Sequence, residues 1–156
     1  MIVLVGCQSD QKSTPVANNF SLHVDAPEDL QAGELFIITG TLVNQSDNTW
    51  DIQHGAAMFT YDVFDSNGDE VSQGIEPLMF ESNVVRIIND IGFIKSLQPQ
   101  EQYSNDGEDH VSPKNNKYIL PTGNYTIVSK AKFRIPYDGT GYEFEIESEP
   151  LSIKVT

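Results

Sequence analysis

Histidine and cysteine are the residue types in this sequence with the greatest capacity for catalysis or metal binding. The three histidines, His23, His54 and His110, lie far apart, and no serine or cysteine nucleophile sits in a recognisable elbow. A triad could still assemble in the folded chain, but no motif indicates one. Because Cys7 is the only cysteine, no intramolecular disulfide and no zinc site built on cysteine spacing can form. We therefore expect a protein that is not an enzyme, with no catalytic residues, metal or cofactor.

Two acidic segments, residues 65–70 and 106–109, have the oxygen-rich composition that calcium prefers. The first reads Asp-Ser-Asn-Gly-Asp-Glu and places oxygen atoms at alternate positions. It lacks the EF-hand spacing, which needs glycine at the sixth position and glutamate at the twelfth. A hairpin turn explains the same residues, because Asn67 and Gly68 both tolerate positive φ. The sequence therefore favours a turn, with a calcium-stabilised domain as the weaker alternative.

The charge balance narrows the classes of partner. Nine lysines and arginines stand against 23 aspartates and glutamates, which gives a formal net charge of −14. Such a surface repels phosphate backbones, so we expect no nucleic-acid partner. Solubility is the simplest interpretation of the charge, and a docking surface for a cationic partner or divalent ions is the alternative. A length of 156 residues with 38% hydrophobic residues suits one domain with its own core.

The N-terminal residues offer an explanation for the lone cysteine. An apolar run, Met-Ile-Val-Leu-Val-Gly, precedes Cys7, and the sequence turns polar directly after it. The segment Leu4-Val5-Gly6-Cys7 resembles the lipobox of bacterial lipoprotein precursors. The resemblance implies cleavage before Cys7, which then carries a diacylglyceryl thioether as the mature N-terminus. The alternative is a short apolar strand with an incidental cysteine.

A lipobox divides the chain into three parts. Residues 1–6 are then the remnant of a signal peptide, residues 7–19 the lipidated cysteine with a flexible polar tether, and residues 20–156 the folded domain. Two or three acyl chains, at about 0.8 kcal/mol per buried methylene, hold a protein on a bilayer. We therefore expect the membrane to be a partner through the lipid on Cys7, at the extracytoplasmic face of the cell membrane.

After residue 19 the sequence reads as β-strands. Apolar residues alternate with polar ones or occur in short β-branched runs. The expected strands cover residues 20–24, 35–43, 50–52, 58–64, 125–133, 142–146 and 151–155, separated by polar turns. Residues 74–117 have a mixed pattern that fits strands or a short helix at 84–91. These elements predict an all-β protein, an immunoglobulin-like antiparallel β-sandwich of about seven to nine strands.

Two aromatic residues support the sandwich. Tyr125 follows Leu-Pro-Thr-Gly-Asn, which resembles the approach to a tyrosine corner, where a hydroxyl bonds back to upstream backbone. Trp50 lies where the third strand of such domains places a buried indole. An exposed aromatic binding platform is the alternative for both, but we expect both to pack in the core.

Four segments, in order, carry a resemblance to a known family. They are residues 40–47, the hairpin 61–68, Leu97-Gln98-Pro99-Gln100-Glu101, and residues 120–125. Together they resemble the immunoglobulin-like domain of the intracellular proteinase inhibitors of Gram-positive bacilli, relatives of which occur in secreted lipoproteins. Gln100 stands where that family usually has glycine. The resemblance implies inhibition through an exposed loop, for which residues 76–84 or 105–113 are available.

These observations favour one function over two alternatives. The leading hypothesis is a non-enzymatic, membrane-anchored binding module that contacts a protein or a cell-envelope component through strand edges or loops. A proteinase inhibitor and a calcium-stabilised envelope domain are the alternatives.

Overall fold

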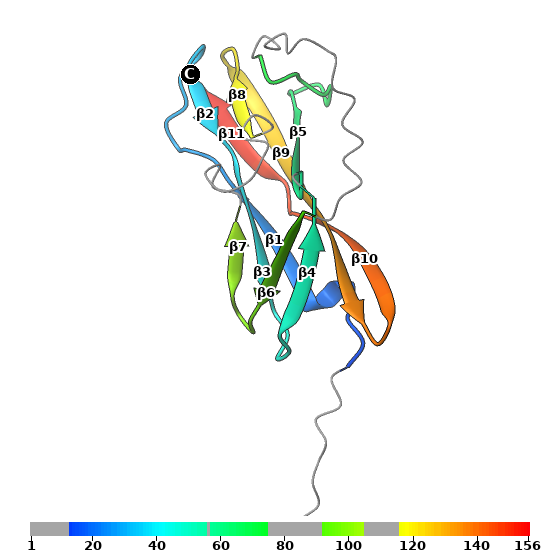
Figure 1. The fold of residues 1–156 in the computed structure, drawn as a ribbon. Coiled ribbons are helices and arrows are strands. Elements are labelled where there is room, and N and C mark those ends of the chain that lie inside the picture. Colours follow the sequence, from blue (N-terminus) through cyan, green and yellow to red (C-terminus); the bar gives the residue numbers. More distant parts are fainter. Residues whose placement is uncertain (1–12, 56, 75–91, 105–115) are drawn as a thin grey trace, which may run out of the picture.

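The structure, a computed structural model, describes residues 13–55, 57–74, 92–104 and 116–156. In these ranges the regular elements are strands and one turn of 3-10 helix (Figure 1). In chain order they are η1 (Ala17–Asn19), β1 (Phe20–Asp25), β2 (Leu35–Ile37), β3 (Thr39–Asn44), β4 (Trp50–His54), β5 (Phe59–Phe64), β6 (Phe93–Leu97), β7 (Gln102–Ser104), β8 (Lys117–Ile119), β9 (Gly123–Tyr137), β10 (Thr140–Glu147) and β11 (Leu151–Val155). The predicted all-β class is confirmed.

The long strand β9 organises the larger sheet. It pairs with β10 and β11 along one edge and with β5 and β4 along the other, and β6 extends the sheet beyond β4. A smaller sheet, in the order β1-β3-β7, packs against it, and β2 pairs with β8. All these strand pairs are antiparallel. The predicted antiparallel sandwich is thus confirmed, while its immunoglobulin-like topology stays a prediction.

The core lies between the two sheets and follows from the alternation of side chains along the strands. In β1 the side chains at even positions are buried, and in β9 the odd positions from Tyr125 to Ile135 are buried. Phe20 of β1 meets Phe133 of β9 edge-on, with ring centroids 5.0 Å apart. Such edge-to-face contacts are favourable beyond the area that they bury. They join the two layers into one core.

The described residues alone form eleven strands, more than the expected seven to nine, partly because one predicted strand is divided into two. Residues 35–43 were expected as one strand, but the run divides at Ile38 into β2, which pairs with β8, and β3, which pairs with β1. The fully buried Ile38 donates its N–H to the carbonyl of Asn116 at 2.8 Å. The chain therefore leaves one sheet for another at this residue. The short helix considered at residues 84–91 lies outside the described residues.

Trp50 and Tyr125 both pack in the core, as predicted. The Trp50 side chain is completely buried, and Tyr125 is nearly so. The Tyr125 hydroxyl donates to the carbonyl oxygen of Pro121 at 2.9 Å. This bond to backbone four residues upstream is the geometry of a tyrosine corner.

Replacing Tyr125 with phenylalanine removes that hydroxyl and leaves the ring in place. We expect Tyr125→Phe to lower the free energy of unfolding by about 1–2 kcal/mol, because the Pro121 carbonyl loses its partner in a partly buried place. Urea unfolding measures the change. The matched control is Tyr142→Phe, on β10, which should cost less than about 0.5 kcal/mol. Equal losses in the two variants would contradict the corner's role.

Residues 13–19 belong to the folded structure, although the sequence suggested the end of a tether there. Pro15 is buried, and η1 is closed by a bond from Asn19 N–H to the Val16 carbonyl at 3.0 Å. The Asn19 carbonyl in turn accepts from the N–H of Gln45 at 2.8 Å. The chain thus enters the domain at the end where the turns β3–β4, β6–β7 and β9–β10 lie, away from the C-terminus (Figure 1). Among the described residues no helix is long and apolar enough to cross a bilayer.

Candidate functional site

Several residues singled out from the sequence lie outside the part of the chain that the structure describes. They are Cys7, His110, the acidic segment 106–109 and the loops 76–84 and 105–113. Lipidation of Cys7 and protease inhibition through these loops therefore stay predictions.

The two described histidines are not brought together. His23 is exposed on β1, whereas His54, at the end of β4, is buried between the sheets. His54 Nδ1 lies 2.8 Å from the Gly55 carbonyl oxygen, and Nε2 lies 2.9 Å from the Tyr103 hydroxyl. A carbonyl only accepts, so Nδ1 carries the proton and, in the neutral ring, Nε2 accepts from Tyr103. This histidine links β4 to β7 across the sandwich.

The acidic segment at residues 65–70 forms the predicted hairpin turn. Asp65 Oδ1 accepts the N–H groups of Asn67 at 2.8 Å and Asp69 at 3.0 Å. These backbone bonds, led by that from Asp69, hold the pKa of Asp65 below its usual range. Of the two central residues of this turn, Gly68 adopts a positive φ of 85° and Asn67 does not. The bonds to Asn67 and Asp69 account for the position of the Asp65 carboxylate in the turn.

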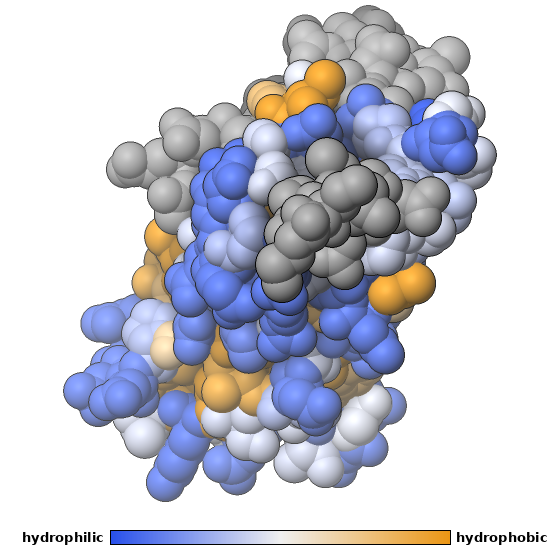
Figure 2. Space-filling view, turned by 90° about the horizontal axis from the view of Figure 1, so that it is seen from below, coloured by the Kyte–Doolittle hydropathy of each residue, from blue (hydrophilic) through white to orange (hydrophobic). Residues whose placement is uncertain are grey.

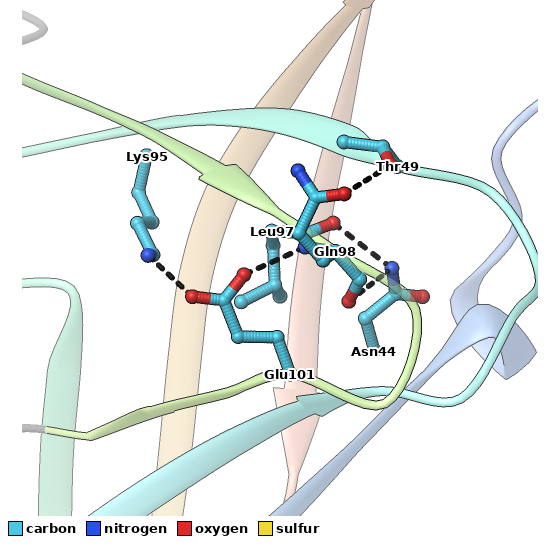
Figure 3. Close-up of polar contacts among 6 residues, drawn as sticks. All are labelled: Asn44, Thr49, Lys95, Leu97, Gln98 and Glu101. Carbon is cyan, nitrogen blue, oxygen red and sulfur yellow. Dashed lines mark hydrogen bonds and ion pairs between the residues drawn. The ribbon is translucent and has the colours of Figure 1, made fainter.

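Asn44, the last residue of β3, is the centre of a buried polar network at the end of the sandwich (Figure 3). Its Nδ2 donates to the carbonyl oxygens of Asn48, Leu97 and Gln98 at 2.7, 3.0 and 3.1 Å. Its Oδ1 accepts from the N–H and the hydroxyl of Ser46 at 3.0 and 2.7 Å. One fully buried side chain thus ties the β3–β4 turn to the β6–β7 turn.

Lys95 and Glu101 close the same end of the sandwich at its edge. Lys95 comes from β6 and Glu101 from the turn before β7, and their charged groups are 2.5 Å apart. The other carboxylate oxygen accepts the Gln98 N–H at 2.8 Å (Figure 3). The hydrogen bond from Lys95, with that from Gln98, lowers the pKa of Glu101 below its ordinary value of 4.5.

Because this pKa is depressed in the folded chain, the ionised Glu101 stabilises the fold above pH 4.5, and that contribution disappears as the pH falls through the folded-state pKa. We therefore expect Glu101→Gln to lose less melting temperature than the wild type between pH 7 and pH 3. Thermal unfolding at a series of pH values measures this. Glu143→Gln, on the exposed face of β10, is the matched control. Identical pH profiles for Glu101→Gln and the wild type would contradict the prediction.

Gln100 adopts the left-handed conformation, with φ of 62°. Its N–H donates to the Asn44 carbonyl at 2.8 Å, so the turn geometry is fixed by the network around Asn44. A side chain in this region costs about 1–2 kcal/mol, which glycine avoids. This is the position at which the resembled family usually has glycine.

We expect Gln100→Gly to raise the free energy of unfolding by about 0.5–1 kcal/mol, after the greater entropy of glycine in the unfolded chain is subtracted. Urea unfolding is the measurement. Gln45→Gly, in the neighbouring turn and without a positive φ, should instead destabilise by about 0.5–1 kcal/mol. A Gln100→Gly variant less stable than the wild type would overturn the strain assigned to this residue.

A concave surface runs along β1. It has a volume of about 450 Å³ and is lined by residues 22–25 of β1, by Thr41 and Gln102, and by residues 149–151 at the bend between β10 and β11. We call it the β1 groove. It brings backbone, apolar side chains and two carboxylates to one place. The volume is within the range of ligand sites.

A polar row on β1 borders this groove. Ser21, His23 and Asp25 alternate along the strand and face outward, opposite the buried row. Ser21 Oγ lies 3.5 Å from His23 Nε2, the limit of a hydrogen bond. Within the described chain no bond joins Asp25 to His23, so the row lacks the oriented base that a nucleophilic serine requires.

The sequence analysis predicted the buried row of β1 and did not consider the polar row on its other face. The signal was present, because Ser21, His23 and Asp25 occupy every second position between apolar residues. The groove itself has no such signal, since its far wall, residues 149–151, comes from the other end of the chain.

Comparison with known proteins adds little. No family model matches the chain, and no curated protein matches it. A crystal structure described as the Northeast Structural Genomics Consortium target SoR45 is similar over 88% of this chain and 88% of its own, with 15% identity and a TM-score of 0.40. Similarity at this level defines neither a family nor an activity.

Proposed function

We propose that this chain is a non-enzymatic interaction module of the bacterial cell envelope, anchored by a lipid on Cys7 and binding a protein or envelope component through a strand edge. The observation that carries the proposal is the place where the chain enters the domain. Residues 13–19 lie at one end of the sandwich, and the C-terminus lies at the other (Figure 1). An anchor on Cys7 leaves the sheet faces and the β1 groove away from the entry end.

The surface at the entry end suits this orientation. Figure 2 shows the molecule from that end, with hydrophilic residues over most of the described surface and apolar areas between them. The turns there are tied together by Asn44 and by the Lys95–Glu101 pair. A rigid polar end can stand above lipid headgroups while the acyl chains supply the membrane affinity.

Cross-linking in intact bacteria tests the proposal. The full chain, expressed from its natural gene with a C-terminal tag, is treated with a membrane-permeable amine cross-linker and purified in detergent. We expect discrete cross-linked species with the wild type that are strongly reduced in Cys7→Ser, because loss of the lipid removes the protein from the membrane surface. The same species in equal amounts from both would contradict the anchor, and none from either would contradict the binding role.

A further inference from the structure

Resting on the proposed function, we propose that the free edge of β1 binds an extended segment of a partner protein in which basic and apolar side chains alternate. The first observation is the open edge. In the part of the chain that the structure describes, β1 pairs with β3 on one side only, over six residues. The β1 groove runs along residues 22–25 of this strand. An extended peptide can add to such an edge through backbone hydrogen bonds.

The second observation is that β1 lacks the protection found at another edge of the sandwich. On the edge strand β6, Lys95 reaches toward β7 to pair with Glu101, and a charge directed inward discourages the addition of a further strand. The inward row of β1 is instead apolar, consisting of Phe20, Leu22 and Val24. An incoming strand therefore meets no buried charge at β1.

The third observation concerns charge. The lining of the β1 groove includes two carboxylates, Asp25 and Glu149, and no lysine or arginine. Both acids are exposed, so basic side chains of a partner can reach them and form ion pairs. The net charge of −14 adds long-range attraction for a cationic segment.

The alternation of the occupant follows from strand geometry. Successive side chains of an added strand point to opposite faces. One row lies on the outer face beside His23 and Asp25, and the other lies on the inner face, where the side chains of β1 are apolar.

Fluorescence anisotropy of labelled eight-residue peptides, titrated with the full chain at low salt, tests the proposal. Three probes are compared: alternating lysine and valine, alternating glutamate and valine, and the lysine peptide N-methylated at every second residue. We expect the lysine peptide to bind with a dissociation constant on the order of 100 µM, and the other two at least about tenfold more weakly. N-methylation separates strand addition from simple charge attraction, because it removes backbone donors and keeps the charge.

A pair of double variants localises the binding. Asp25→Asn with Glu149→Gln should weaken the lysine peptide about fivefold. Asp47→Asn with Glu143→Gln removes the same charge outside the groove and should leave the affinity within about twofold of the wild type. Hydrogen exchange of the full chain should show slower exchange of β1 amides, and not of β6 amides, when the lysine peptide is present.

Three results would each overturn the inference: equal binding of the lysine and glutamate peptides, full binding of the N-methylated peptide, or the same affinity in the two double variants. If the peptides fail while cross-linking in bacteria still depends on Cys7, the β1 edge is wrong and the anchored interaction module stands. If both fail, both proposals are overturned.

Discussion

Replacing Asn44 with alanine is expected to lower the free energy of unfolding by about 3–5 kcal/mol, a large effect for a single polar residue. The amide is fully buried, and its two N–H groups are shared among three carbonyl oxygens. Alanine removes this donor from the three carbonyls and this acceptor from the Ser46 N–H, while the Ser46 hydroxyl keeps the Asn48 carbonyl oxygen at 3.3 Å. Each buried group left in this way costs about 1–3 kcal/mol.

Urea unfolding followed by the fluorescence of Trp50, the single tryptophan, measures this effect. Asn48→Ala is the matched control in the same turn. Its side chain makes a 3.4 Å contact with Ser13 at the exposed surface, so we expect a loss below about 0.5 kcal/mol. A loss below about 1 kcal/mol in Asn44→Ala would show that the network does not hold the end of the sandwich together.

Trp50→Ala is expected to destabilise the domain by about 3–5 kcal/mol. The indole is completely buried, contacts the Tyr137 ring edge-on at 6.0 Å, and donates Nε1–H to Ser46 Oγ at 2.9 Å. Its removal leaves a large cavity and releases the hydroxyl that also bonds Asn44. Against a total stability of about 5–15 kcal/mol for a domain of this kind, the loss is a substantial fraction.

Circular dichroism is the measurement, because the variant has no tryptophan fluorescence. Trp50→Phe is the control: it keeps an aromatic ring in the cavity and loses the N–H, so it should cost about 1–3 kcal/mol, less than alanine. Stability of Trp50→Ala within about 1 kcal/mol of the wild type would contradict the placement of the indole in the core.

The sequence was informative where a structure depends on local alternation. The apolar rows of β1 and β11 and the hairpin at residues 65–69 follow from residue types at short spacing. The hydrogen bond of the Tyr125 hydroxyl could also be predicted, because its partner Pro121 is only four residues away. In each of these cases the interaction that fixes the structure lies within a few residues.

Contacts between residues far apart in the sequence could not be predicted from such local patterns. Asn44 sits in an ordinary polar turn, yet the Leu97 carbonyl that it binds is 53 residues away. The division of residues 35–43 at Ile38 depends on Asn116, and the β1 groove depends on residues 149–151. These contacts are set by which distant strands pair, and the local sequence of a strand is compatible with many partners.

Intact mass spectrometry with detergent partitioning tests whether a lipid on Cys7 anchors the domain. The chain is expressed in a bacterium from its natural gene, beside Cys7→Ser. We expect the wild type to have the mass of a chain that begins at Cys7 and carries acyl groups and to enter the detergent phase, whereas the variant stays in the aqueous phase. An unmodified wild-type mass in the aqueous phase would contradict it, leave Cys7 a free thiol, and make the proteinase inhibitor the favoured alternative.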